Sequence, residues 1–265
     1  MFKLCRLFKL KKKSIRSNIG IRSSYSTATE KDETFEEYFE KHHIPISNFQ
    51  RLLLSVGSAA TAIIDPYRAD MVACLGETTG FLALEYMCSQ MEKSEEGSQI
   101  LKEKPRINTN TINLEILRSM PHNTLAKCYL NFLEENKVTP DSRDPVRFVD
   151  DVKLAYVLQR YREIHDFAHA LLGMNISILG EITIKWFEAV QNRLPMCYLG
   201  ALMGPFLLNS KERNDLSKYY LPWAIETGMN SAFLMNIYFE NRWDQPIDEL
   251  RKELNINPLI LPKSS

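Results

Sequence analysis

The chain has 265 residues, of which 45% are hydrophobic and 25% are charged, a balance typical of an ordinary soluble globular domain with a sizeable core. Its formal net charge is zero, but eight of the 33 Lys and Arg residues lie within residues 1–29, which contain no acid. The rest of the chain therefore has 25 basic against 33 acidic residues, a net charge of about −8, so we expect no nucleic-acid partner.

The first segment, residues 1–29, has the composition of a mitochondrial transit peptide. It is basic and rich in serine, and apolar residues are interleaved with its charges. No uninterrupted apolar run of about 7–15 residues follows the basic start, which argues against secretion. We predict a presequence at residues 1–29 and one functional domain at residues 30–265; the alternative is a basic arm on a cytosolic protein.

Apolar residues in the next part of the chain recur with the spacing of helices. After a polar leader or short surface helix up to residue 47, helices are expected over 51–64, after Asp70 and over 82–91. The first of these ends at Asp65-Pro66, because the residue before a proline is disfavoured in a helix.

The middle of the chain is richer in charges and turn formers. The charged segment 92–104, which contains Gly97, is predicted to be a loop. Residues 107–117 are expected to form an extended entry into a helix. A further helix is predicted over 125–136, before the turn formers that dominate up to Pro145.

The C-terminal half contains the longest helical patterns. Asp150 and Asp151 are capping candidates for a helix over 152–172. Further helices are predicted over 178–193, 219–238 and 248–254. Few stretches alternate with period two over the length of a strand, so the predicted fold class is all-α, with a single helical domain.

Two features of the composition bear on the cell compartment. The five cysteines are odd in number and form no CxxC pair, which predicts reduced and buried thiols. The longest apolar run, 194–208, is interrupted by Pro195 and Pro205 and is shorter than the roughly 18 residues that a membrane span requires. The sequence therefore predicts no transmembrane helix.

The segment 161–186 contains the residues that are best suited to chemistry. His165 and His169 are four positions apart, so on a helix both imidazoles leave the same face, one turn apart. They lie on the apolar stripe of the predicted helix, and Asp166 lies at its edge. Glu181 comes early in the next helix, where an antiparallel return could bring it opposite the histidines.

Two imidazoles and two carboxylates form a nitrogen–oxygen donor set. Such ligands suit Zn²⁺, and also Fe²⁺, Mn²⁺ or Mg²⁺ if water completes the coordination sphere. The simpler alternative is a chance His pair in the core, with Glu181 paired to Lys185 four residues on. A zinc protease would have Glu in place of Asp166, and a di-iron bundle needs a second Glu-x-x-His helix. An HD-type phosphohydrolase would need an upstream ligand, and the available His122 is expected in a loop.

Beyond these residues, the pattern resembles a known family. His165-Asp166-x-x-His169, followed after eleven residues by Glu181, is similar to the signature of the family of the fourth coenzyme Q biosynthesis protein. Other segments that resemble this family are Asp65-Pro66-x-Arg68, MVACLGETTG at 71–80, PRI at 105–107, TPDSRDPVRFVDD at 139–151, KWFEAVQNRLPMC at 185–197, GALMGP at 200–205, YYLPWA at 219–224 and NIYFENRW at 236–243. The resemblance covers residues 35–260.

The resemblance implies an all-helical fold and one bound divalent ion, zinc or similar, held by His165, Asp166, His169 and Glu181. It implies a peripheral protein on the matrix side of the mitochondrial inner membrane, within a multi-subunit complex of ubiquinone-biosynthesis enzymes; a homo-oligomer is left open. The reaction assigned to the family is loss of the carboxylate from ring carbon one of 4-hydroxy-3-methoxy-5-polyprenylbenzoate.

The residues are compatible with that decarboxylase chemistry. Loss of the carboxylate requires a proton at the ring carbon, and Asp166 and Glu181 are the candidate donors. A metal would stabilise developing charge, whereas an oxidative version would need oxygen and a redox-active ion in place of zinc. The apolar run 194–208 is the candidate channel or membrane contact for the polyprenyl tail, with a buried core helix as the alternative.

A non-catalytic scaffold or lipid-binding subunit is the competing function, and a phosphohydrolase is a distant third.

Overall fold

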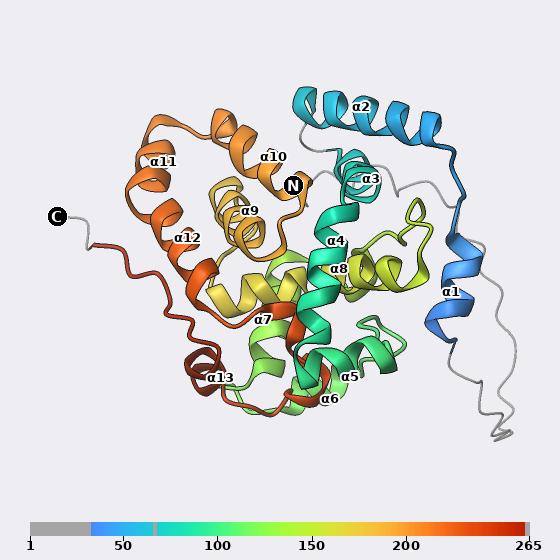
Figure 1. Cartoon of the computed structure of the whole chain (residues 1–265). Helices are drawn as coiled ribbons and strands as arrows, with labels where there is room; N and C mark the ends of the chain where they lie inside the picture. The colour runs from blue at the N-terminus through green and yellow to red at the C-terminus, as the bar shows by residue number, and fades with distance from the viewer. Residues whose placement is uncertain (1–32, 66–67, 263–265) are drawn as a thin grey trace, which may run out of the picture.

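The computed structural model describes residues 33–65 and 68–262 of the chain, and within them it is an all-α protein with no β-strand (Figure 1). The helices of the first half are α1 (Phe35–His42), α2 (Asn48–Ile64), α3 (Ala69–Thr79), α4 (Phe81–Glu92), α5 (Glu95–Glu103), α6 (Leu114–Ser119) and α7 (Leu125–Asn136). Those of the second half are α8 (Val152–Leu172), α9 (Ile178–Asn192), α10 (Pro195–Met203), α11 (Ser210–Asp215), α12 (Leu221–Asn230) and α13 (Ile247–Glu253). The predicted fold class, a single all-α domain, is confirmed.

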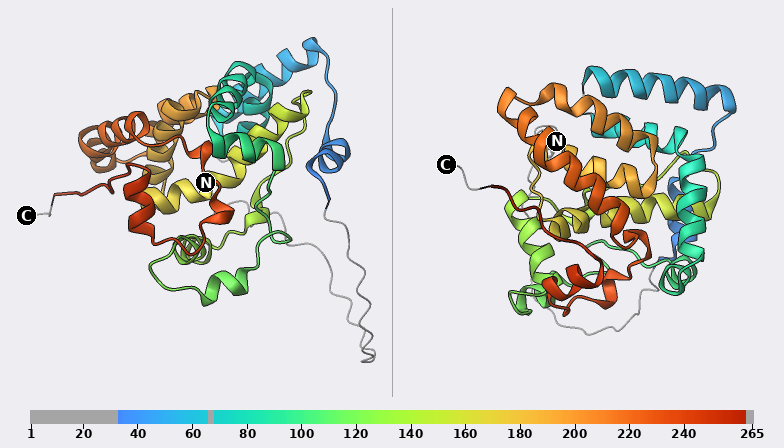
Figure 2. Two further views of the ribbon diagram at one scale, coloured as in Figure 1. Left: turned by 60° about the horizontal axis from the view of Figure 1, so that its bottom comes forward. Right: turned by 60° about the vertical axis from the view of Figure 1, so that its left-hand side comes forward.

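Helix α8 is the centre of the domain, and α1, α4, α5 and α7 pack against it (Figures 1 and 2). Every residue from 154 to 172 is buried, so α8 cannot have the exposed polar face of a surface helix. Its buried charges are paired instead: the Arg162 guanidinium lies 2.7 Å from Glu77, and the Glu163 carboxylate lies 2.7 Å from Arg106. The pairs keep these buried groups from being left uncompensated.

The ends of α8 are set by local signals that the sequence already contained. The Asp151 carboxylate accepts a hydrogen bond from the Leu154 N–H at 2.9 Å, and Gly173 ends the helix in the left-handed conformation with φ 67°. The predictions over 152–172 and 125–136 match α8 and α7 at both ends.

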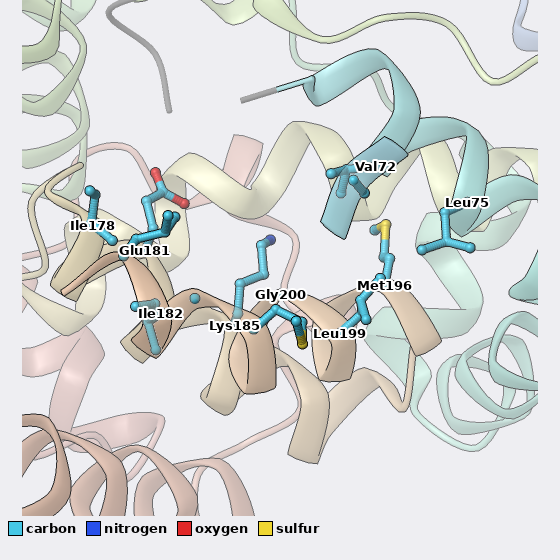
Figure 3. Close-up of a pocket in the computed structure, with 13 residues that line it drawn as sticks. Val72, Leu75, Ile178, Glu181, Ile182, Lys185, Met196, Leu199 and Gly200 are labelled. Carbon is cyan, nitrogen blue, oxygen red and sulfur yellow. The ribbon is translucent and has the colours of Figure 1, made fainter. Parts of the chain in front are cut away.

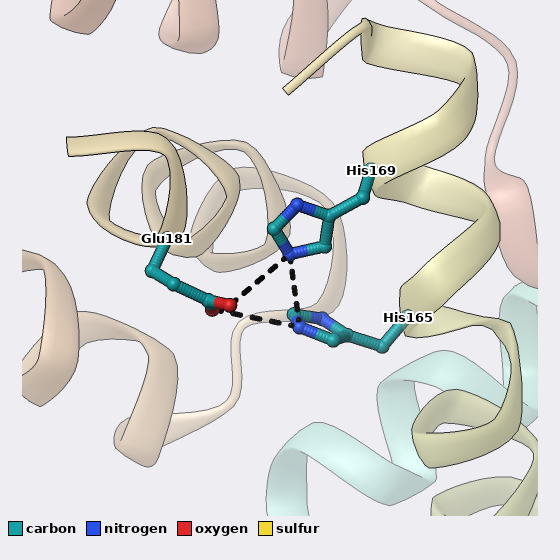
Figure 4. A group of neighbouring side chains, drawn as sticks. All are labelled: His165, His169 and Glu181. Carbon is teal, nitrogen blue, oxygen red and sulfur yellow. Dashed lines mark hydrogen bonds and ion pairs between the residues drawn. The ribbon is translucent and has the colours of Figure 1, made fainter. Parts of the chain in front are cut away.

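A second group of helices lies beside this centre. Helices α10 and α12 pack on α9, and α3 packs on both α10 and α2. Helices α2 and α10 lie on the same side of the molecule in each view (Figures 1 and 2). Helix α9 crosses α8 and does not run back alongside it, so the predicted antiparallel return is wrong in its geometry (Figure 4).

One segment that was predicted to be a loop is a helix. The segment 92–104 is not a loop but contains α5, whose first turn is capped by the Ser94 hydroxyl and whose Ile100 and Leu101 are buried. Gly97 lies within this helix and does not break it. Glycine is needed there for close packing, because a Cβ at this position would lie 2.5 Å from the Met91 carbonyl oxygen.

The predicted helix over 219–238 ends early. Helix α12 stops at Asn230, and the chain then turns so that the Ala232 N–H donates to the Leu254 carbonyl oxygen at 2.9 Å. That hydrogen bond joins distant parts of the chain, so local spacing could not reveal it. Elsewhere, the extended entry predicted over 107–117 leads into the short helix α6, whereas α11 was not predicted.

Two sequence predictions concern the membrane and the N-terminus. Within residues 33–65 and 68–262, no helix is both long and apolar enough to cross a bilayer. The presequence predicted at residues 1–29 lies outside the described residues.

Candidate metal centre

Three of the four predicted metal ligands meet between α8 and α9 (Figure 4). The Nε2 atoms of His165 and His169 are 3.3 Å apart. The Glu181 carboxylate faces both, with its two oxygens 3.7 Å from His165 Nε2 and 3.5 Å from His169 Nε2. All three side chains are buried, so one ion between them would be shielded from solvent.

Local features of the chain bring Glu181 to the two histidines. The Ser177 hydroxyl caps α9 by accepting a hydrogen bond from the Gly180 N–H at 3.1 Å. A Cβ on Gly180 would lie 2.1 Å from the Asn175 carbonyl oxygen, so only glycine allows the chain to turn this tightly. The turn after Gly173 is therefore short, and Glu181 lies in the first turn of α9.

Hydrogen bonds outside the triad orient both imidazoles. The Nδ1 of His165 lies 2.5 Å from a Glu188 oxygen, and the Nδ1 of His169 lies 3.0 Å from the Met174 carbonyl oxygen. Both partners are acceptors, so they favour the tautomer in which Nδ1 carries the proton and Nε2 presents its lone pair to the centre. This is the arrangement found around metal-binding histidines.

The donor set fits a divalent cation. With both Nδ1 atoms protonated, two Nε2 lone pairs face each other at 3.3 Å, and Glu181 Oε1 is buried without a hydrogen-bond partner. Without an ion, a proton on an imidazole takes its place: burial alone raises the pKa of Glu181, but a charged imidazole outweighs burial and lowers that pKa well below its usual range. An ionised oxygen and two nitrogens pointing at one position suit zinc, and also Fe²⁺, Mn²⁺ or Mg²⁺ with added water.

Asp166 takes a different position. Its carboxylate is buried and forms an ion pair with Arg143, and it is not part of the group around the two Nε2 atoms. Arg143 lies just after the 3-10 turn Pro140–Ser142, in a segment whose residues predicted only turns. The ligand role of Asp166, like the proton-donor roles of Asp166 and Glu181, stays a prediction.

Three further polar residues near the triad, Tyr161, Lys185 and Glu188, were missed as site residues. Lys185 does not pair with Glu181, as the simpler alternative supposed, but with Glu188, at 2.6 Å. The Tyr161 hydroxyl donates to the same Glu188 carboxylate at 2.7 Å. The spacing of Glu181, Lys185 and Glu188 along one face of a helix was the available signal.

A pocket with a largely apolar lining opens beside the triad, between α2, α3, α9 and α10 (Figure 3). It encloses about 750 Å³ including its open mouth. Its only charged lining residues in the described part of the chain are Glu181 and Lys185. The Glu181 carboxylate therefore belongs both to the triad and to the pocket.

The apolar run 194–208 is partly core and partly surface. Met196, Cys197 and Ala201 are buried, whereas Leu202 and Phe206 are 57% and 77% exposed. Helix α2, which lies on the same side of the molecule as α10 (Figure 1), also exposes large apolar side chains: Phe49, Leu52, Leu53, Val56, Ile63 and Ile64. The core-helix alternative therefore holds for the buried part of this run, and the role of the exposed part as a channel or membrane contact stays a prediction.

Known proteins resemble this chain over most of its length. The family model described as coenzyme Q (ubiquinone) biosynthesis protein Coq4 matches residues 40–259. A protein from Bombyx mori named ubiquinone biosynthesis protein COQ4 homolog, mitochondrial, is 50% identical over 248 residues, which cover 93% of this chain and 96% of that protein. A protein of the same name from Mus musculus is 53% identical over 216 residues, covering 82% and 81% of the two chains.

The fold has also been seen in a crystal structure. A putative ubiquinone biosynthesis protein from Nostoc punctiforme superposes with a TM-score of 0.62 at 19% sequence identity. The match covers 80% of this chain and 99% of the cyanobacterial one. At that identity the likeness demonstrates a shared fold.

Proposed function

The chain belongs to the Coq4 family of coenzyme Q (ubiquinone) biosynthesis proteins and has a role in ubiquinone biosynthesis, and on that premise we propose that it is a metal-dependent decarboxylase. Its proposed substrate is a 4-hydroxy-3-methoxy-5-polyprenylbenzoate, which loses the carboxylate at ring carbon one. One observation carries the proposal: Glu181 belongs both to a nitrogen–oxygen donor set and to the wall of an apolar pocket. A lipid tail in the pocket would hold a polar ring beside the donor set.

The reaction balances without an oxidant. The bond between ring carbon and carboxylate breaks, carbon dioxide leaves, and the electron pair that remains on the ring carbon takes up a proton. A bound divalent ion supplies a Lewis acid that stabilises negative charge on oxygen. An oxidative course, in which hydroxyl replaces the carboxylate, would need oxygen and a redox-active ion such as Fe²⁺.

The chain's own residues have separate tasks in this scheme. His165, His169 and Glu181 hold the ion, and Glu188 and the Met174 carbonyl orient the imidazoles. The apolar pocket wall binds the tail and excludes water. Asp166 and Glu181 are the two candidate proton donors, and Glu181 would stay ionised while it holds the ion.

We also propose a location and partners. The similar proteins from Bombyx mori and Mus musculus are named mitochondrial, and we assign this chain to the matrix side of the mitochondrial inner membrane as a peripheral protein. The exposed apolar side chains of α2 and of residues 194–208, next to the pocket, support a contact with the bilayer from which a polyprenylated substrate would enter. Association with other ubiquinone-biosynthesis enzymes, and with a second copy of this chain, belongs to the same proposal.

Metal analysis and carbon dioxide release test the function directly. The purified chain is compared with His169→Ala, using a short-chain prenylated 4-hydroxy-3-methoxybenzoate in the presence of oxygen and partner proteins. We expect about one metal per chain and metal-dependent carbon dioxide release in the wild type only. The matched control is His122→Ala, because His122 is exposed in a turn and an HD-type phosphohydrolase would need it as a ligand. Bound metal without carbon dioxide release would instead support the scaffold or lipid-binding function.

A further inference from the structure

Lys185 occupies a distinctive position in the pocket. It follows Glu181 by one turn of α9, and of the thirteen described residues that line the pocket it is the only cation. Its side chain is 15% exposed, and its ammonium group points into the pocket (Figure 3). A buried charge in an apolar wall is costly unless it has a partner.

The ammonium group is only partly satisfied by the protein. Its Nζ donates to Glu188 at 2.6 Å and to the Tyr161 hydroxyl at 3.2 Å. An ammonium has three donors, so one remains for the pocket. Burial alone lowers the pKa of Lys185, but Glu188 outweighs it and leaves the pKa raised, so the group stays charged.

The charges around Lys185 favour one anion in the pocket. Glu188 is shared, because it also lies 2.5 Å from His165 Nδ1. Glu188 therefore divides its negative charge between the His165 imidazole and the Lys185 ammonium group. An anionic group in the pocket would complete the pairing of Lys185 in a site of low dielectric.

We propose that Lys185 is the anion-binding residue of this pocket and that it pairs with the carboxylate of an amphipathic ligand whose tail fills the apolar wall. Lys185 then sets the position of the carboxylate-bearing ring relative to Glu181. The identification of this ligand as a polyprenylated benzoate rests on the proposed function.

The shape of the pocket supports an apolar tail next to this anion. A Cβ added to Gly200 would lie in ordinary contact with the Lys185 alkyl chain, at 3.5 Å from Cγ, so glycine leaves the space above this side chain open. The pocket continues along apolar residues to Leu207, beside the exposed Phe206. A ligand bound to Lys185 can therefore extend its tail toward the surface.

The test compares two ligands that differ only in the anion. The full chain is titrated with a short-chain prenylated 4-hydroxy-3-methoxybenzoate and with the corresponding prenylated methoxyphenol that lacks the carboxylate. Lys185→Met should weaken binding of the benzoate about 10-fold to 100-fold and leave binding of the phenol nearly unchanged. Lys185→Arg should retain the preference for the benzoate.

Two further variants separate charge from packing. Lys185→Gln keeps a donor for Glu188 but has no charge, so it repeats the test if the Met variant does not fold. Gly200→Leu fills the pocket without changing its charge and should weaken both ligands alike.

The outcomes separate this inference from the proposed function. Equal effects of Lys185→Met and Lys185→Gln on the two ligands, or wild-type protein that does not prefer the benzoate, would overturn the inference. Carbon dioxide release with an unchanged KM in these variants would leave the decarboxylase standing and refute the role of Lys185. Selective binding of the benzoate without carbon dioxide release would support the role of Lys185 and refute the decarboxylase.

Discussion

Replacing Glu188 by Gln tests whether this carboxylate orients His165 for metal binding. Glu188 is buried, and one of its oxygens lies 2.5 Å from His165 Nδ1. Burial alone raises the pKa of Glu188, but His165 and Lys185 outweigh it and lower that pKa below its usual range, so the carboxylate is ionised. The Gln variant has nearly the same shape and can still accept the Nδ1 hydrogen bond through its amide oxygen. Its amide nitrogen then faces Lys185 and Tyr161 and cannot accept their hydrogen bonds, so the change removes the charge and these two contacts.

The size of the effect follows from this contact. An ionised acceptor makes His165 a more basic ligand and holds its ring in place, and loss of such a partner costs metal affinity by about 10-fold to 100-fold. That corresponds to about 1.4–2.7 kcal/mol of metal-binding free energy. The variant should therefore still bind zinc, but more weakly.

A competition titration against a chromophoric zinc chelator measures the affinity, and thermal unfolding of the metal-free protein measures stability. Glu77→Gln is the matched control. Like Glu188, Glu77 is a buried carboxylate paired to a cation, in this case Arg162, but it contacts none of the triad. It should lower the Tm and leave zinc affinity unchanged. Wild-type zinc affinity in Glu188→Gln, or equal losses in both variants, would refute the assignment of Glu188 as a positioning residue.

Two other predictions concern packing and the surface. Gly97→Ala should destabilise the protein by about 1–3 kcal/mol in urea unfolding, because the new Cβ would lie 2.5 Å from backbone of the preceding helix. Gly57→Ala is the control: nothing lies within 4 Å of a Cβ there on exposed α2, so it should instead stabilise the protein by up to about 1 kcal/mol. A larger loss of stability in Gly57→Ala than in Gly97→Ala would contradict this account of α5. The double change Leu52→Ser and Val56→Ser should reduce sedimentation with liposomes of inner-membrane composition without lowering the Tm, since both side chains are more than half exposed. Ile116→Ser, at 54% exposure on α6, is the control, and an equal loss there would argue against a membrane contact through α2.

The ligands of the candidate centre show how far local information reaches. His165 and His169 share a face because any α-helix brings residues four apart together, and the ends of α8 follow from the Asp151 cap and Gly173. These features depend on hydrogen bonds within a few residues, so they could be predicted from the sequence. The family followed from motifs spread along the chain, and the match over residues 40–259 confirms it.

The partners of the charged residues could not be predicted in this way. Lys185 was as well spaced to pair with Glu181 as with Glu188, and packing against Tyr161 brought it to Glu188. Asp166 lies next to a ligand in sequence, yet an ion pair with Arg143, more than twenty residues away, directs its carboxylate elsewhere.

The sequence by itself therefore determined the all-α class, the long buried helix and the two histidines, because each depends on the geometry of one helix. The tertiary structure decided which carboxylate completes the triad, which anion holds Lys185, and that an apolar pocket opens beside them. The physical reason is that these contacts join side chains from different helices. Their pairing is set by how α2, α3, α8, α9 and α10 pack, and residue spacing within one helix contains no information about that packing.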